Sequence, residues 1–527
     1  SVTNPDGSVI SYMYDAKGNR TSVTVPSGTT TYTFDALNRL ATVTDPSGGV
    51  TAYSYDDNGN REQVINPNGT IAEYTYDTLN RLIYLENRTS AGDVISCYFY
   101  TLGPTGNRLS VSENTGRVMN YTYDLIYRLI QEEILDPVNG NETISYSYDS
   151  KGNRLTKTDS TGTVAYSYDV NDRLLTETGP AYVRTYSYDL NGNTITKSAA
   201  GESIAYDYNF ENQLTGMQTL ASTVAYQYDA DGIRVAQDVD GAQTVFIVDK
   251  NRQYAQILEE RDTLGSLTVS YIHGDDLVSQ DRSGVKSYFH HDGLTSTRAL
   301  TNSSETVTDT YDYEAFGNII QQTGNTQNSF LFAGESLDSA VNWYYLRARY
   351  YNPGIGRFVT TDPLEGKPLD PVTLHKYMYA KMNPVMYIDP SGKFFIGTML
   401  SGGFRLLGGL AAGYYIGGGI EMIHNYNRVV LQGENATICG SGSTGVIVPD
   451  DPFGFHFSNP CSIHDACYGG SGTARSNCDW DFYENMMDVC RDLRNNGGGA
   501  LTYCHCSLTA RHYYIMVMAL GWTAYQP

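Results

Sequence analysis

Cysteine is nearly absent from the first 438 residues of this 527-residue chain, where Cys97 stands alone. The other seven cysteines fall between Cys439 and Cys506. Such density in a short segment is typical of a disulfide scaffold and of an oxidising final compartment. Seven is an odd number, so one C-terminal thiol is left over or pairs elsewhere.

Basic residues are also scarce. The chain has 35 Lys and Arg against 58 Asp and Glu, a net charge of −23. Nucleic-acid binding needs clustered Lys and Arg, so this balance argues against a nucleic-acid partner. Residues 1–393 hold 29 basic and 48 acidic residues, and residues 394–527 hold 6 and 10. A chain this long exceeds one compact core, so we expect at least two domains.

Long apolar runs are missing, with one exception. Residues 394–423 are apolar and glycine-rich, with Arg405 as the only charge before Glu421. The run is long enough to span a bilayer, but its glycines disfavour a stable helix, so we favour a linker. An initiator Met and a signal peptide are missing too. Because the chain opens inside a repeat, at Ser1-Val2-Thr3, we expect a fragment of a longer protein.

What the sequence has in abundance is a tyrosine-rich repeat. Residues 1 to about 230 follow the pattern Y-x-Y-D-x-x-G-N-R-L, with alternating Thr, Tyr, Val and Ser that predict a strand. The D-x-x-G-N that follows predicts a turn, because Gly and Asn tolerate positive φ. The second aromatic recurs at Tyr14, Phe34, Tyr55, Tyr76, Tyr100, Tyr123, Tyr148, Tyr168, Tyr188, Tyr208 and Tyr228. The pattern predicts β-hairpins that pair edge to edge, with rows of tyrosines along the sheet. Sugar binding by those rows is the functional alternative.

This repeat resembles the YD repeats of Rhs proteins, of the C components of insecticidal Tc toxin complexes and of teneurins. The resemblance rests on eleven registered copies over about 230 residues. It implies strands that spiral into a hollow shell enclosing a polypeptide. Eleven repeats look too few to close such a shell, and the period decays between about 231 and 310.

A second block begins at residue 311. It holds Y-D-Y-E-A-F-G-N at 311–318, W-Y-Y-L-R-A-R-Y-Y-N-P at 343–353 and I-D-P-S-G at 388–392. It resembles the Rhs core-associated segment, which plugs the shell and precedes a variable C-terminal effector.

The same resemblance implies an aspartyl-protease-like pair, Asp362 and Asp389, that releases the effector by self-cleavage after about Lys393. Two carboxylates that share a proton could act as acid and base on a nearby peptide. The structural alternative is simple Asp-Pro turn formation. The chain departs from the family at D-P-L-E-G, residues 362–366, and at Lys393, where the family usually has Leu.

The densest cluster of reactive side chains is C-x-x-H-D-x-C-Y-G at residues 461–469. On a helix, Cys461, His464 and either Asp465 or Cys467 lie one turn apart and can serve one site. Upstream, C-G-S-G at 439–442 predicts a loop that can turn its carbonyls inward, because glycine tolerates the backbone angles. Carbonyl oxygens and a carboxylate are the ligand set of Ca²⁺. Residues 476–490 predict a second helix.

Together these pieces resemble secreted phospholipase A2, and the loop resembles most the bee-venom (group III) type. The resemblance implies that His464 is the general base on a water that attacks the sn-2 ester of a glycerophospholipid, and that Asp479 orients it, with Asp481 as runner-up. It implies Ca²⁺ held by Asp465 and the carbonyls of Ile438, Gly440 and Gly442. Asp450 or Asp451 is the alternative side-chain ligand. The implied disulfides are Cys439–Cys461, Cys467–Cys478, and Cys490 with Cys504 or Cys506.

Two rival chemistries stay open for this cluster. Cys461, His464, Cys467 and Cys478 could hold a structural zinc ion, although the C-G-x-G loop would then be unexplained. A Cys–His nucleophile fits less well, because every cysteine here has a disulfide role. The doubled cysteine usual before the histidine is absent, since Pro460 precedes Cys461.

The sequence thus predicts a mainly β protein. It has a partial YD-repeat spiral shell at 1–310, a plug at 311–393, an apolar linker at 394–436 and a small α-helical, disulfide-rich phospholipase A2-like effector at 437–527. We expect a secreted toxin, delivered to a target cell, that hydrolyses membrane glycerophospholipids in a periplasmic or extracellular compartment. The expected partners are a cognate immunity protein and the remainder of a parent Rhs protein. The alternatives are a non-enzymatic adhesion or carbohydrate-binding protein, and a toxin that disrupts membranes without turnover.

Overall fold

The computed structural model describes residues 1–4, 7–366, 370–397, 436–439 and 446–449. Two units are distinguished: Ser1–Ala91, Tyr98–Val111 and Val118–Leu406 form the first, and Gly92–Cys97, Ser112–Arg117 and Leu407–Pro527 form the second. The described residues are mainly β-strand, and their only helices are three short 3-10 turns. The predicted mainly β class is confirmed. The predicted helical, disulfide-rich effector lies outside the described residues, apart from the strands β38 (Ala436–Cys439) and β39 (Val446–Pro449).

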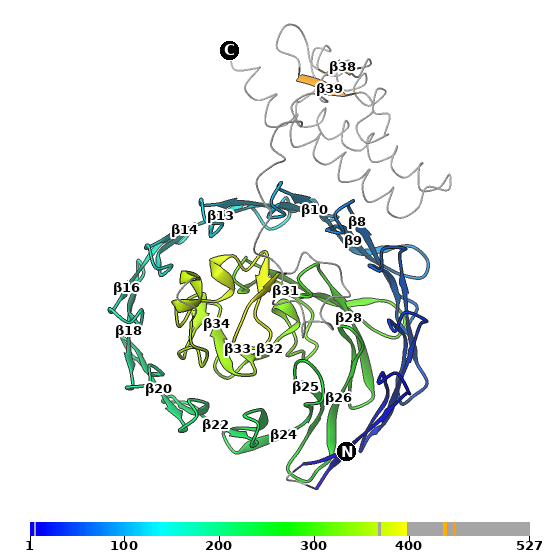
Figure 1. Ribbon diagram of the computed structural model, residues 1–527. Coiled ribbons are helices and arrows are strands. Elements are labelled where there is room, and N and C mark those ends of the chain that lie inside the picture. Colours follow the sequence, from blue (N-terminus) through cyan, green and yellow to red (C-terminus); the bar gives the residue numbers. More distant parts are fainter. Residues whose placement is uncertain (5–6, 367–369, 398–435, 440–445, 450–527) are drawn as a thin grey trace. The chain divides into compact units, whose positions relative to one another are not determined.

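One antiparallel sheet of 31 strands makes up the wall of the fold (Figure 1). From β1 to β9 and from β12 to β31, each strand pairs with its neighbours in sequence. The strands are β1 (Val2–Thr3), β2 (Val9–Tyr14), β3 (Arg20–Val25), β4 (Gly28–Phe34), β5 (Leu40–Thr44), β6 (Val50–Tyr55), β7 (Arg61–Ile65), β8 (Ile71–Tyr76), β9 (Leu82–Arg88), β10 (Val94–Leu102), β11 (Arg108–Glu113), β12 (Val118–Tyr123), β13 (Leu129–Leu135), β14 (Glu142–Tyr148), β15 (Arg154–Asp159), β16 (Gly162–Tyr168), β17 (Leu174–Thr178), β18 (Val183–Tyr188), β19 (Thr194–Ala199), β20 (Glu202–Tyr208), β21 (Leu214–Gln218), β22 (Thr223–Tyr228), β23 (Arg234–Val239), β24 (Ala242–Asp249), β25 (Gln256–Arg261), β26 (Leu267–His273), β27 (Leu277–Arg282), β28 (Val285–His291), β29 (Thr297–Thr301), β30 (Val307–Tyr313) and β31 (Ile319–Thr323).

The D-x-x-G-N segments form the hairpin turns that the sequence predicts. In the turn after β2, the amide N of Asp15 donates to the carbonyl of Asn19, and Asp15 Oδ1 accepts from the amides of Lys17 and Asn19. The third residue after the aspartate has positive φ in each such turn, for example 88° at Gly18 and 62° at Asn38. That backbone region suits Gly and Asn, which occupy this position in most of the turns, whereas Tyr127 and Asp172 occupy it in two others, each with a φ of 64°.

The repeated tyrosines tie neighbouring repeats together. In six of the motifs the second Tyr donates its hydroxyl to a carbonyl of the preceding repeat, as Tyr76 does to Arg61 and Tyr168 does to Arg154. The first Tyr is buried in five successive repeats, at Tyr146, Tyr166, Tyr186, Tyr206 and Tyr226. These rings pack inside the fold, so they are not presented to an external sugar.

After one pass the sheet meets its own beginning. Side chains in the segment from β2 to β9 contact the part of the chain from β24 onward. The residues that these contacts join are 204 to 241 positions apart in the sequence. Arg20 pairs with Asp249 at 2.6 Å, Arg61 with Asp276 at 2.7 Å and Lys286 with Asp45 at 2.7 Å. The partners of β2–β9 lie beyond the eleven repeats, in the part of the chain from β24 onward, so the segment in which the period decays brings the sheet back to its own beginning.

We call these long-range contacts between the beginning and the end of the sheet the seam. Arg61 provides a test of the seam. It is 5% exposed and lies 4.5 Å from the ring centre of Tyr74, so Arg61→Ala removes a buried cation that pairs with Asp276. We expect it to lower the free energy of unfolding by about 3–5 kcal/mol in urea denaturation. The control is Arg39→Ala, whose partner is Asp35 on a half-exposed turn and which should cost less than about 1 kcal/mol. Equal losses in the two variants would contradict a stabilising seam.

The wall extends beyond the expected boundary at residue 310. That boundary falls inside β30, which pairs with β31 out to Thr323. Glu314 takes the place of the turn aspartate, and its Oε1 accepts from the amide N and Nδ2 of Asn318. The segment 311–318 is thus one more hairpin turn of the repeat.

Residues 324–366 and 370–397 lie inside the ring formed by the wall (Figure 1). Their elements are η1 (Phe332–Gly334), β32 (Ser336–Asp338), β33 (Trp343–Leu346), β34 (Arg349–Asn352), β35 (Arg357–Phe358), η2 (Pro371–Leu374), η3 (Ala380–Met382), β36 (Tyr387–Ile388) and β37 (Ile396–Gly397). We call this segment the plug. β32–β35 form a four-stranded sheet, and β36 pairs with β37.

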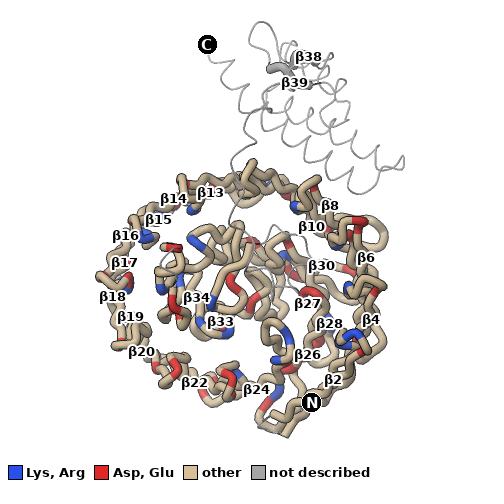
Figure 2. Tube along the Cα trace, viewed as in Figure 1, with Lys and Arg blue, Asp and Glu red and all other residues tan. Residues whose placement is uncertain are grey.

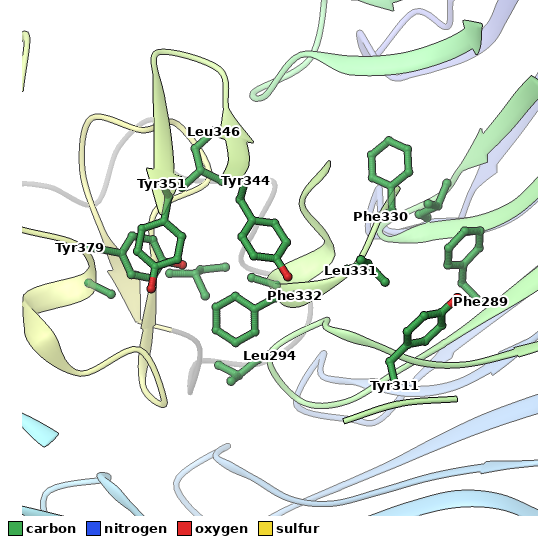
Figure 3. Close-up of a cluster of buried hydrophobic side chains, with 14 of the residues drawn as sticks. Phe289, Leu294, Tyr311, Phe330, Leu331, Phe332, Tyr344, Leu346, Tyr351 and Tyr379 are labelled. Carbon is green, nitrogen blue, oxygen red and sulfur yellow. The ribbon is translucent and has the colours of Figure 1, made fainter. Parts of the chain in front are cut away.

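The plug and the wall share a hydrophobic core. Tyr344, Tyr351 and Tyr379 of the plug lie on one side of Phe332, and Phe289 and Tyr311 of the wall lie on the other (Figure 3). Buried polar contacts add to it: Arg234 of the wall pairs with Asp338 of the plug at 2.6 Å. Basic and acidic residues are interspersed through both parts (Figure 2).

Two further sequence features are the isolated Cys97 and the apolar run at 394–423. Cys97 is fully buried and disulfide-bonded. Among the described residues, no helix is long and apolar enough to cross a membrane. The apolar run at 394–423 lies outside that part of the chain, except for residues 394–397.

Candidate functional site

The structure brings Asp362 and Asp389 together on one arginine. Arg349 begins β34, Asp362 follows β35, and Asp389 follows β36. Arg349 Nη2 lies 2.9 Å from Asp362 Oδ2 and 3.5 Å from Asp389 Oδ2. Because both carboxylates contact the same nitrogen atom, two aspartates that are 27 positions apart in the sequence meet in one site.

The arginine is held from several sides. Its Nε donates to the carbonyl of Gly392, and its Nη1 donates to the carbonyl of Lys376 at 3.2 Å. The guanidinium carbon lies 3.5 Å from the ring centre of Phe358. Arg349 is 4% exposed, so its charge is shielded from water and fixed in place.

Asp389 also contacts the backbone that follows it. Its Oδ1 accepts from the Ser391 hydroxyl at 3.0 Å and from the amides of Lys393 and Phe394, both at 3.1 Å. Gly392 has a φ of 67° in this turn, and a Cβ there would collide with the carbonyl of Leu346. The D-P-S-G sequence therefore folds the Lys393–Phe394 peptide onto the carboxylate.

Burial shifts both partners toward their neutral forms. It raises the pKa of Asp389 above its ordinary value, against the lowering effect of Arg349. It likewise lowers the pKa of Arg349, and the two carboxylates oppose that shift. Asp389 thus holds a proton to higher pH than an ordinary carboxyl group does.

The arrangement differs from the expected proton-sharing pair. In the described part of the chain no hydrogen bond joins the two carboxylates directly, and a guanidinium stands between them. Reasoning from the sequence missed Arg349, although it lies in the conspicuous W-Y-Y-L-R-A-R-Y-Y-N-P stretch. The available signal was an arginine that opens an otherwise aromatic strand.

The second predicted site falls almost wholly outside the described residues. This holds for His464, Asp465, Asp479, Asp481, Asp450, Asp451, Gly440 and Gly442 and for the cysteines from Cys461 onward. Ile438 lies in β38 and pairs with Ile447 of β39. Within the described ranges, no group of three or more His, Cys, Asp or Glu side chains is placed to hold a metal ion.

A buried histidine joins the plug to the wall beside this site. His375 Nε2 lies 2.9 Å from Asn153 Oδ1, and Asn153 Nδ2 donates to Asp149 and Asp172. The Asn153 oxygen is therefore the acceptor and Nε2 the donor. His375 Nδ1 accepts from the amide of Tyr377 at 3.2 Å, which leaves no site for a second proton.

This histidine should make stability depend on pH. Burial, and then Arg357, lowers the pKa of His375 to about 4, whereas in the unfolded chain it titrates near 6.5. The unfolded state therefore binds more protons between those values, so the stabilisation is complete above pH 6.5 and is lost as pH falls. Between pH 7 and pH 5 we expect wild type to lose about 2 kcal/mol more than His375→Gln in urea denaturation. Parallel pH profiles for the two proteins would contradict the assignment.

Comparison with known proteins supports the repeat architecture. The teneurin YD-shell family matches residues 105–385, more than half of the chain, and the RHS repeat family matches residues 1–30 and 34–71. The tRNA3(Ser)-specific nuclease WapA of Bacillus spizizenii is 31% identical over 34% of this chain. Double-stranded DNA deaminase toxin A of Burkholderia cenocepacia is 24% identical over 31% of it. The chain spans 8% and 11% of the lengths of these two relatives.

Solved structures show the same fold. The crystal structure of TcdB2-TccC3-Cdc42 superposes with a TM-score of 0.60 at 18% identity, over 73% of this chain and 22% of that one. The Tc holotoxin pore of Photorhabdus luminescens gives a TM-score of 0.58 at 18% identity, over 74% and 22%.

Proposed function

The chain belongs to the teneurin YD-shell family, and on that premise we propose that its wall and plug hold a C-terminal toxin segment and cut it free after Lys393. The observation that carries this proposal is the meeting of Asp362 and Asp389 on Arg349, with the Phe394 amide on Asp389. The relatives named as a nuclease and as a deaminase toxin agree with a toxin role.

The proposed cut is a hydrolysis of the Lys393–Phe394 peptide bond. Water adds to the Lys393 carbonyl carbon, the C–N bond breaks, and the Phe394 nitrogen takes up a proton. In the uncut chain Asp389 Oδ1 accepts from that nitrogen's N–H at 3.1 Å. After water has added and the nitrogen carries a free lone pair, the protonated Asp389 carboxyl group, whose pKa is raised by burial, would donate the proton to it. Asp362, paired with Arg349, is the candidate to accept the proton that the water loses. The test is whether this one bond is cut, and whether the cut needs both aspartates.

For the C-terminal segment we propose calcium-dependent hydrolysis of glycerophospholipids, supported by the motifs at 438–442 and 461–481. His464 would take the proton of the attacking water, and Asp479 would fix the imidazole. The proposed ligands, the Asp465 carboxylate and the carbonyls of Ile438, Gly440 and Gly442, are all oxygen, which suits Ca²⁺. When bound, calcium would supply positive charge that polarises the ester. A membrane, an immunity protein and the remainder of a longer parent protein are the proposed partners.

A second candidate is a segment that acts on nucleic acid. The names of two relatives, a tRNA nuclease and a double-stranded DNA deaminase toxin, favour it. The charge of residues 394–527, 6 basic against 10 acidic, weighs against it. Release of fatty acid or of nucleotides by the cut segment distinguishes the two.

A further inference from the structure

The four residues after Lys393 do not simply leave the plug. Ile396 and Gly397 form β37, which pairs with β36 through Ile388↔Ile396 and Tyr387↔Gly397. Ile396 also packs against the hydrophobic core that the plug shares with the wall. The segment beyond the proposed cut is therefore part of the plug's own structure.

Phe395, the residue just before β37, contacts the aromatic ring of Tyr387 and the ammonium group of Lys381. The ring centre of Phe395 lies 5.6 Å from that of Tyr387, with the planes at 77°. Lys381 Nζ lies 4.3 Å from the centre of the Phe395 ring and 5.4 Å from that of Tyr387. Edge-to-face stacking and cation–π attraction each stabilise such a contact modestly.

The backbone that carries Lys381 is strained. Ala380, Lys381 and Met382 have φ values of 48°, 55° and 56°, three consecutive residues in the left-handed region without a glycine. Each such residue costs energy and persists only where its surroundings fix it. Here the side chains of Ala380 and Met382 are buried, and Asn383 Nδ2 donates to the carbonyl of Tyr127 at 2.8 Å. The plug thus keeps a strained turn at the position that places Lys381 over Phe395.

We propose that Phe395, Ile396 and Gly397 are a docking segment, which keeps the C-terminal part bound to the plug after the peptide bond is cut. The inference rests on the proposed self-cleavage, which would make Phe394 a new N-terminus. None of the contacts of residues 395–397 with Lys381, Tyr387 and Ile388 involves the Lys393–Phe394 bond, so they survive its hydrolysis. The individual contacts are weak, so the docking is reversible, and separation needs a second event that pulls residues 395–397 away.

The test is hydrogen exchange on the full chain, read by mass spectrometry on peptides that cover residues 387–400. The variants are Lys381→Met and Phe395→Ala, and the control is Lys17→Met, a lysine on an exposed turn of the wall. Each is measured in the natural chain and in an Asp389→Asn chain. The same spectra show whether the bond after Lys393 is intact, so a failure of cleavage is seen separately from a failure of docking.

We expect amides 395–397 to keep their protection in the cut natural chain and to exchange about tenfold faster in Lys381→Met and in Phe395→Ala. Lys17→Met should leave them unchanged. Loss of protection on cutting alone would overturn the proposal, as would equal exchange in Lys381→Met and Lys17→Met. If no chain is cut, that comparison of the two lysine variants still decides whether the segment is docked.

Discussion

Asp389→Asn leaves the chain uncut, and so does Asp362→Asn. Asparagine keeps the size and most hydrogen bonds of the carboxyl group but neither donates nor accepts the proton that hydrolysis needs. We expect the rate of cutting to fall by about 10²–10⁴-fold in each variant. The measurement is the fraction of cut chain over time, from intact-protein mass spectra. Burial raises the pKa of Asp389, and the proposed proton donor is its protonated form. Cutting of the natural chain should therefore slow as the pH rises above the pKa of Asp389.

Asp370→Asn is the matched control for this experiment. Asp370 precedes Pro371 just as Asp362 precedes Pro363 and Asp389 precedes Pro390, but it is the N-cap residue of η2 and makes no side-chain capping bond there. It should be cut at the natural rate. If all three variants are cut equally, the aspartates are turn residues only, and the proposed chemistry is wrong.

His464→Ala abolishes fatty-acid release from mixed phospholipid vesicles. The expected loss is about 10²–10⁴-fold, because the imidazole is the proposed general base. Removing Ca²⁺ with EDTA should have an effect of similar size, because all the proposed ligands are oxygen atoms that favour this ion. The assay uses the full chain and, separately, its oxidised C-terminal cleavage product.

His456→Ala is the control, since it removes a nearby histidine outside the C-x-x-H-D-x-C pattern. It should retain natural activity. Release that ignores both His464 and calcium would contradict the lipase proposal. Calcium-independent vesicle leakage without release of fatty acid would favour membrane disruption. Zinc in the purified protein would favour the structural zinc site. Degradation of added RNA or DNA would favour a segment that acts on nucleic acid.

Local chemistry explains why the wall could be predicted from the sequence. Each hairpin is specified by residues within its own repeat. These are the alternating strand residues, the D-x-x-G-N turn and the recurrent Tyr-x-Tyr. The turn at Glu314 was not predicted, because Glu replaces the usual Asp. Glu314 nevertheless accepts hydrogen bonds from Asn318, as the turn aspartates do from the residue four positions on. The sequence therefore predicts that the block at 311–318 belongs to the plug, whereas it is a hairpin of the wall.

Contacts across long stretches of chain could not be predicted in this way. The pairing of Arg61 with Asp276 joins two passes of the sheet, and no local pattern specifies which residues meet. The same is true of Arg349, whose partners come from two loops of the plug. Resemblance pointed to the two aspartates, but only the fold showed that an arginine stands between them.

The most direct test of the account is the mass of the fragments of the purified natural chain. The account predicts a C-terminal fragment that begins at Phe394 and an N-terminal fragment that ends at Lys393, both absent from Asp389→Asn. A single intact chain of 527 residues, or the same fragments from Asp389→Asn, would contradict it.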